Sequence, residues 1–180
     1  MKSKSAVLFS FLLGIVPASS IQVMLDNVSF CNSTGMVDCD VRVHKINRTT
    51  AALIGNIVQK VDIGGSYSAL IEAYHSPMGN SQFNRYPMKI GPISMCEFLN
   101  DYWGDYYGYV VQFIENIAKP GECPFTARSY QVKDWIMDSR LLPPYVSTGL
   151  WRMMWSAWDN QTGDVFMTEI VFKVYDDGHF

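Results

Sequence analysis

The sequence has few charged residues and no long apolar run beyond its N-terminus. Charged residues make up 17% of the chain and the net charge is −3, whereas an average soluble domain has about 25% charged residues. The lysines and arginines are scattered, which argues against a nucleic-acid partner. After residue 20, no stretch reaches the roughly 18 uninterrupted apolar residues of a membrane span. We therefore expect a protein that is not membrane-spanning and does not bind nucleic acid.

The motifs of hydrolases and metalloenzymes are also missing. The three histidines are far apart in the sequence, and none belongs to an H-E-x-x-H motif. The nearest approach to a nucleophile elbow, Gly64–Ser68, lacks the final glycine of G-x-S-x-G. The cysteines contain no C-x-x-C pair and have no paired histidines to complete a zinc site. We predict no enzymatic activity, no catalytic residues, no metal and no cofactor.

The first twenty residues are typical of a secretory signal peptide. Lys2 and Lys4 precede the apolar run Ala6–Val16, and small residues follow at Pro17–Ser20. Removal of residues 1–20 leaves a single domain over residues 21–180, so the mature protein is expected to be extracellular and secreted. A secreted chain can be glycosylated at its N-x-Ser/Thr sequons, which are Asn27, Asn32, Asn47 and Asn160.

Four cysteines in a secreted chain imply two disulfides, with three possible pairings. We favour Cys96–Cys123, because this bridge would hold a helical, aromatic-rich excursion against the chain on either side. Cys31–Cys39 would then close a short loop around Gly35.

Most of the chain has the alternating pattern of antiparallel strands. In Ala51–Ile63, apolar side chains alternate with polar ones, as in a half-buried strand. Gly64–Ser66 then turns the chain, which predicts a hairpin over Ala51–Tyr74. A last hairpin is expected to pair Gly149–Trp158 with Val165–Tyr175. With some six to eight strands and no βαβ alternation, the fold is predicted to be all-β, an antiparallel two-sheet β-sandwich or cup. Further extended segments are expected at Ile21–Phe30, Cys39–Lys45 and Tyr130–Ile136.

One helical excursion interrupts the strands midway along the chain. Ser94 and Glu97 have the spacing of a capping box, which predicts the start of a helix. The helical pattern is interrupted at Gly104–Gly108, resumes as far as Ile117, and ends at Lys119–Gly121. Such a broken, tyrosine-rich segment packs poorly as regular core, so we interpret it as a lid.

Methionine and aromatic residues are the remaining functional signal, with ten Met, ten Phe, ten Tyr and five Trp. Adaptable methionine walls and amphipathic rings at an entrance suit a pocket for an apolar ligand. The same residues would also suit a filled core with an aromatic patch for a protein partner. The residues alone leave these two interpretations about even.

Four short motifs in the chain have a familiar sequence and spacing: Tyr86–Lys89, Cys96–Leu99, Gly121–Phe125 and Gly149–Arg152. With the signal peptide, they resemble insect secreted proteins related to the ganglioside activator. That group includes the chemosensory protein B family and looks like a distant branch of the ML-type lipid-recognition sandwiches. The resemblance implies a hydrophobic cavity between two sheets, no catalytic residues, and the presentation of lipids or apolar semiochemicals in taste or other sensory tissue.

We therefore expect a secreted, non-enzymatic binding protein for a lipid or other apolar small molecule, acting in chemosensation. A membrane receptor or an ion channel is a candidate partner. The alternative is a secreted protein-interaction module, such as a co-receptor or receptor modulator, with a filled core and an aromatic binding patch.

The residues expected to contact the ligand form two groups. The lid residues are Phe98, Leu99, Tyr102, Trp103, Tyr106, Val110 and Phe113. The interior residues are Trp151, Met153, Trp155, Phe166, Ile170 and Phe172.

Overall fold

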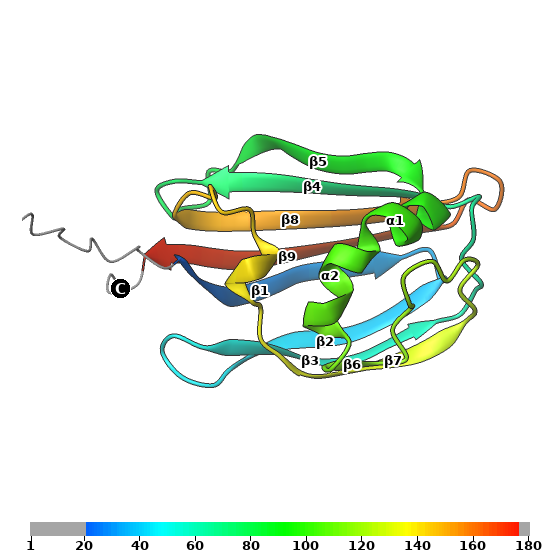
Figure 1. Cartoon of the computed structure of the whole chain (residues 1–180), viewed down its shortest axis with the longest axis horizontal. Coiled ribbons are helices and arrows are strands. Elements are labelled where there is room, and N and C mark those ends of the chain that lie inside the picture. The colour runs from blue at the N-terminus through cyan, green and yellow to red at the C-terminus, as the bar shows by residue number, and fades with distance from the viewer. Residues whose placement is uncertain (1–20, 177–180) are drawn as a thin grey trace, which may run out of the picture.

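The computed structural model describes residues 21–176, which form two antiparallel sheets packed face to face (Figure 1). The predicted signal peptide lies outside these residues. The elements in chain order are β1 Ile21–Ser33, β2 Val37–Lys45, β3 Ala51–Gln59, β4 Ser68–Ser76, β5 Asn84–Ser94, α1 Met95–Asp101, α2 Trp103–Val110, β6 Ile114–Glu115, β7 Arg128–Trp135, η1 Ser139–Leu141, β8 Gly149–Trp158 and β9 Val165–Asp176. One sheet has the strand order β1-β9-β8-β4-β5, and the other has the order β2-β3-β7-β6. The predicted all-β sandwich is confirmed.

The predicted last hairpin is formed by β8 and β9. Trp151 lies opposite Phe172, and Met153 lies opposite Ile170. The apolar positions of both strands therefore share one face. This face packs toward the four-stranded sheet, because Trp151 and Phe172 belong to the same buried cluster as Leu53 of β3. Alternation along the chain was sufficient to predict both the pairing and the buried face.

The predicted hairpin over Ala51–Tyr74 is wrong. β3 pairs with β2 and β7 in one sheet, whereas β4 pairs with β5 and β8 in the other. The turn between β3 and β4 thus carries the chain from one sheet to the other. Alternation shows which face of a strand is buried, but it does not identify the strand's neighbour.

The edge strand β5 is not predicted by the sequence pattern. It contains two prolines and Gly91, which interrupt the alternation and read as loop. Gly91 lies at φ +92°, at a register shift in which Ala69 pairs with Ile93 and Ile71 pairs with Ile90. A Cβ at Gly91 would lie 2.3 Å from the carbonyl oxygen of Ala69, so the close approach of β4 requires glycine here.

The helical segment starts as predicted but breaks elsewhere. Ser94 caps α1, because its Oγ accepts a hydrogen bond of 3.1 Å from the Glu97 amide. The break lies at Tyr102, and Gly104 and Gly108 lie inside α2. The predicted continuation to Ile117 is wrong, since the chain leaves the helix after Val110 and forms β6. A Cβ at either glycine would meet nothing within 4 Å, so no close contact requires glycine at these positions. The two glycines lower the helix propensity of α2 but do not interrupt it.

Both predicted disulfides are present. Cys31 in β1 is bonded to Cys39 in β2, and these strands belong to different sheets. Cys96 in α1, directly after β5, is bonded to Cys123 in the loop between β6 and β7. The first bridge joins the two sheets directly, and the second ties the start of α1 to the loop between two strands of the four-stranded sheet.

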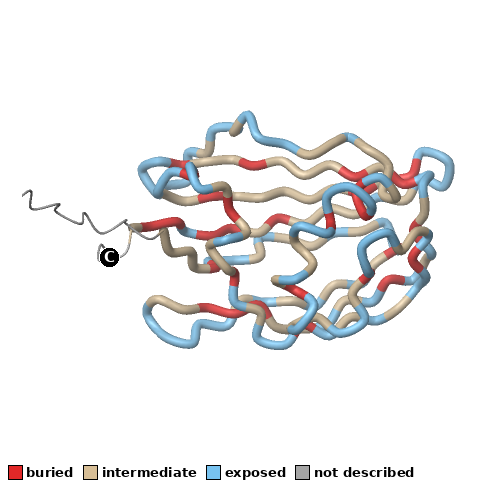
Figure 2. The backbone as a smooth tube through the Cα atoms, viewed as in Figure 1, coloured by how far each residue is buried: buried red, intermediate tan, exposed pale blue. Residues whose placement is uncertain are grey.

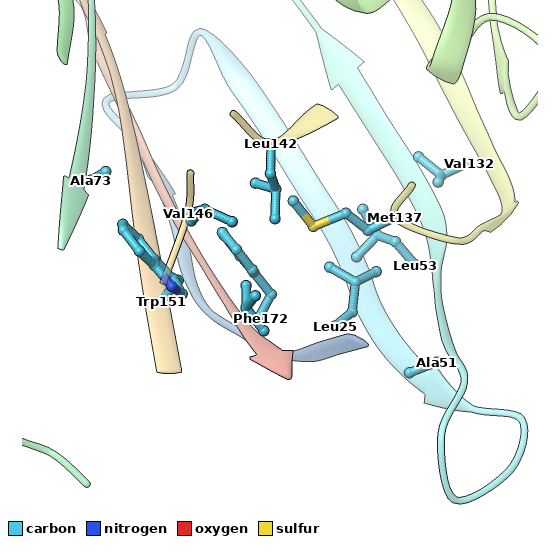
Figure 3. Close-up of a cluster of buried hydrophobic side chains, with 11 residues drawn as sticks. Leu25, Ala51, Leu53, Ala73, Val132, Met137, Leu142, Val146, Trp151 and Phe172 are labelled. Atoms are coloured by element: carbon cyan, nitrogen blue, oxygen red, sulfur yellow. The ribbon is translucent and has the colours of Figure 1, made fainter. Parts of the chain in front are cut away.

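The buried apolar residues form two clusters at the two ends of the sandwich (Figure 2). The η1 cluster packs the segment around η1 against both sheets, as Figure 3 shows for Leu142 and Val146 beside Phe172. The helix cluster packs the underside of α1 and α2. The η1 cluster comprises Leu25, Ala51, Leu53, Ala73, Val132, Met137, Leu142, Val146, Trp151, Phe172 and Val174. The helix cluster comprises Met36, Ile63, Tyr67, Ala69, Phe98, Leu99, Trp103, Val110, Ala118 and Phe125.

The position of the two glycines in α2 leads to a stability prediction. Gly104→Ala and Gly108→Ala should each raise the free energy of unfolding by about 0.5–1 kcal/mol, because alanine has the higher helix propensity. Urea unfolding followed by circular dichroism would measure the change. Gly91→Ala is the matched control and should destabilise the protein, since its Cβ would clash with Ala69. A loss of stability for both α2 variants would contradict a continuous helix.

Candidate functional site

The helical segment crosses one side of the sandwich. β1 and β2 lie at one edge of their respective sheets and contact each other. β5 and β6 lie at the opposite edges, and the chain between them is the α1–α2 segment, which runs from one sheet to the other in Figure 1. The helices thus occupy the position of a cover over the side away from the β1–β2 edge.

The predicted lid residues divide between core and surface. Phe98, Leu99, Trp103 and Val110 are buried in the helix cluster. These four hold the helices to the sheets. Tyr102 is 38% exposed, and the side chains of Tyr106 and Phe113 are partly buried.

Indole hydrogen bonds fasten the helical segment to its surroundings. The Trp103 Nε1–H donates to the carbonyl oxygen of Ala118 over 2.7 Å, in a buried position. The Trp135 Nε1–H of β7 donates to the carbonyl oxygen of Tyr109 over 3.2 Å. Together with the disulfide at the start of α1, these bonds fix both ends of the segment. The segment is therefore attached to the rest of the structure at both ends.

The predicted interior residues all lie on the inner face of the five-stranded sheet, in register across β8 and β9. Two of them, Trp151 and Phe172, are 2% exposed and belong to the η1 cluster. The other four are only partly buried: Met153, Trp155, Phe166 and Ile170.

Several residues in the middle of this inner face are only partly buried. Along β8, Trp151 and Ala157 are buried, whereas Met153 and Trp155 between them are partly exposed. On the neighbouring strand β4, Ile71, which lies opposite Trp155, is likewise only partly buried between the buried Ala69 and Ala73. A filled sandwich buries the middle of its strands most deeply, because the ends lie nearest to solvent. Along β8 that order is reversed, whereas β9 is buried at Phe172 and Val174 and only partly buried toward Phe166.

The opposing sheet supplies apolar side chains to the same region. Ile114 of β6 and Trp135 of β7 are partly buried and contact both clusters. Val41 and Val43 of β2 are partly buried against the η1 cluster. Sequence reasoning did not single these residues out, nor Ile71, because alternation marks them as inward-facing without showing which side chains they meet.

Trp155 carries an unused polar group in this region. Its indole Nε1–H is shielded from solvent and has no hydrogen-bond acceptor within residues 21–176. A buried donor without an acceptor costs about 1–3 kcal/mol. Its ring lies edge-on to Phe98, with 6.3 Å between the ring centroids, so the indole sits beneath α1. An oxygen atom of a bound molecule would satisfy this donor.

A second polar group near the helix cluster is already satisfied. Gln59 is 3% exposed, and its Nε2 donates to the carbonyl oxygens of Val61 and Phe125 over 2.8 and 3.2 Å. The Tyr130 hydroxyl donates to Gln59 Oε1. Burial raises the pKa of Tyr130 to about 12, so its hydroxyl stays protonated and able to donate even in mildly alkaline solution.

Two hollows on the surface lie away from the inner face. One, of about 420 Å³, adjoins the β8–β9 turn on the outer face of the five-stranded sheet. The other, of about 690 Å³, lies beside the loop after β6 and contains Lys119, Glu122 and Arg128. None of the residues predicted to contact a ligand lines either hollow.

Residues 21–176 contain neither a cluster of metal-ligand side chains nor a helix that could span a membrane. In this part of the chain, no three His, Cys, Asp or Glu side chains converge as metal ligands would. None of its helices has the length and apolar character needed to cross a membrane. His75 stacks on Trp151, with 4.3 Å between the ring centroids, and His44 is exposed on β2.

The division of the lid residues predicts unequal effects of truncation. Trp103→Ala should lower the free energy of unfolding by about 3–5 kcal/mol, because it empties a buried aromatic site. Tyr102→Ala should cost less than about 1 kcal/mol, because the ring is largely at the surface. Urea titration of both variants measures the difference. Equal losses would mean that both rings belong to the core.

The ion pair of Glu122 predicts a pH dependence. Its carboxylate accepts from the Arg128 guanidinium and from the Lys119 amide, and these bonds hold the pKa of Glu122 below its ordinary value of 4.5. Because the folded pKa is the lower one, the stabilisation is complete above the unfolded value and is lost as the pH falls through the folded value.

Urea unfolding of the wild type and Glu122→Gln, at several pH values from about 2 to about 6, would measure this effect. The two proteins should differ by up to about 1 kcal/mol at the upper end and by nothing at the lower end. A difference that persists in acid would contradict an electrostatic origin.

A known protein family matches part of the chain. A family described as a protein of unknown function (DUF1091) matches residues 70–153. The matched stretch runs from β4 through the helical cover into β8, and it contains Ile71, Met153 and all seven predicted lid residues. No curated protein matches the chain.

Proposed function

We propose that this protein is a secreted, non-enzymatic binding protein that holds a lipid or another apolar small molecule between its two sheets. The observation that supports this most strongly is that Met153, Trp155 and Ile71 on the inner face are only partly buried, although they lie in the interior of their strands. Apolar surface left in contact with water costs about 25 cal/mol per Å². A bound apolar molecule would recover that free energy.

The residues at the centre suit a ligand with an apolar body and one oxygen atom. Met153 has a flexible thioether side chain that adapts to ligands of different shape. The free Trp155 Nε1–H offers one hydrogen bond within an apolar lining. A fatty acid, a long-chain alcohol or an ester combines these features. The ligand class we propose is therefore a long-chain apolar compound with a carbonyl, carboxyl or hydroxyl oxygen.

The resemblance in the sequence supports a more specific proposal. The motifs that resemble insect relatives of the ganglioside activator all lie within residues 70–153, the stretch matched by the family of unknown function. We propose that the chain is an ML-type, chemosensory protein B-like carrier that presents its ligand to a membrane receptor or ion channel. The signal-like residues 1–20 and the two disulfides support secretion, because disulfides persist in oxidising compartments.

Filling the centre of the inner face tests ligand binding. Met153→Trp should reduce uptake of a naphthylamine fluorophore by about tenfold or more, because the larger ring occupies the proposed site. The unfolding midpoint should change little. Met154→Trp is the matched control, because Met154 points to the outer face of the sheet. This variant should bind the fluorophore as the wild type does.

The same variants distinguish the alternative function. A protein-interaction module with a filled core would take up no fluorophore, and Met153→Trp would then lose about 1–3 kcal/mol through overpacking. Native mass spectrometry of protein secreted from insect cells, followed by organic extraction, would identify a co-purified lipid. A clean apo mass together with no uptake from a lipid panel would overturn the carrier proposal.

A further inference from the structure

The turn between β8 and β9 presents Asn160 at the wall of an apolar hollow. This hollow has a volume of about 420 Å³ and lies on the outer face of the five-stranded sheet, across β4, β8 and β9. Asn160 is exposed and belongs to the sequon Asn160-Gln161-Thr162. Its lining includes Leu70, Ser156, Trp158, Asn160, Asp164 and Met167.

Hydrogen bonds hold this turn in one conformation. The Asp159 amide donates to the carbonyl oxygen of Asp164, and the Gly163 amide donates to that of Asp159, each over 2.9 Å. Gly163 lies at φ +78°, which closes the turn with a left-handed residue. The carboxylates of Asp159 and Asp164 accept from the hydroxyls of Ser66 and Tyr67, each over 2.8 Å. The turn is therefore anchored to the β3–β4 connection.

We propose that Asn160 carries an N-linked glycan whose first sugar, N-acetylglucosamine, packs against Trp158 in this hollow. The inference rests on the proposed secretion, because only a chain in the secretory pathway receives such a glycan. Trp158 ends β8 on its outer face, and Asn160 follows two residues later. Both side chains line the same hollow. The attached sugar is thus held next to the indole.

The lining of the hollow matches the chemistry of this sugar. One face of a pyranose ring consists of C–H groups, which pack on an aromatic ring, while its hydroxyl and acetamide groups point outward. Trp158, Met167 and Leu70 supply apolar surface, and Ser156 and Asp164 add polar groups. Attachment at Asn160 raises the effective concentration of the sugar at this surface. The glycan would shield apolar side chains that water otherwise contacts.

The sequon at Asn47 provides an internal control. Asn47 is also exposed, in the loop between β2 and β3, but it lines neither surface hollow. Its Oδ1 accepts hydrogen bonds from the Thr49 amide and hydroxyl over 2.8 and 3.1 Å, so the side chain bonds within its own loop. A glycan at Asn47 is therefore expected to be independent of Trp158.

The test is a double-mutant cycle on the full chain secreted from insect cells. Glycopeptide mass spectrometry should find Asn160 occupied. Asn160→Gln should lower Tm by about 2–4 °C in the wild type and by much less in Trp158→Ala, because the contact is already absent there. Asn47→Gln should have the same effect on Tm in both backgrounds. If Trp158→Ala does not fold, Trp158→Leu retains apolar bulk without the aromatic face and takes its place in the cycle.

Two results would overturn the proposal. One is an unmodified Asn160 on the secreted protein. The other is an equal loss of Tm from Asn160→Gln in both backgrounds, which would mean that the glycan does not contact Trp158. Fluorophore uptake by the same samples separates this inference from the proposed function. If the Tm effects of the two substitutions are coupled but the protein takes up no fluorophore, the glycan contact is supported and the carrier function is not. If the protein takes up fluorophore but the Tm effects are additive, the carrier function is supported and the glycan contact is excluded.

Discussion

Burial of apolar side chains at the two ends of the sandwich holds the sheets together. The η1 cluster contains residues of both sheets, and the helix cluster contains Ala69 of one sheet and packs against Ile114 and Trp135 of the other. Two disulfides add covalent links. Because both ends are secured, the sheets stay together even though some central side chains are only partly buried. Met153 packs against one cluster and Trp155, two residues later, packs against the other. The partly buried Met153 and Trp155 therefore lie at the boundary between the clusters.

The helical segment contributes to the stability of the fold through its buried side chains. Trp103 buries its ring in the helix cluster and donates a hydrogen bond to Ala118, which fastens the cover to the chain beyond it. Its outer surface carries the exposed Tyr102. Trp155 lies directly beneath, with its ring against Phe98 and its indole N–H unpaired within the described residues. In a carrier, the same segment would seal the side of the sandwich and form one wall of the ligand site.

The two faces of the five-stranded sheet would serve different purposes. Adjacent residues of β8 point in opposite directions, so Met153 faces the proposed ligand region while Met154 faces outward. The outer face ends in the apolar hollow beside Asn160, where a tethered sugar would replace the protein contacts that the inner face obtains from the second sheet. This arrangement would allow a weakly charged chain to keep apolar side chains on both faces of one sheet.

Local patterns in the chain were enough to predict the sandwich, the β8–β9 hairpin and the Ser94 cap, because alternation and capping depend on residues close in sequence. The positions of the four cysteines around a helical excursion and a short loop were enough to predict both disulfide pairs. They failed where the outcome depends on distant neighbours. Ala51–Tyr74 reads as a hairpin, yet its two strands belong to different sheets, since strand pairing is settled by the packing of the whole chain. Gly104 and Gly108 read as a break, yet buried Trp103 and Val110 hold α2 together around them. The sequence also did not predict which inward-facing residues stay partly exposed. The exposure of Met153 and Trp155 depends on how the opposing sheet packs over them, and local alternation contains no information about that packing.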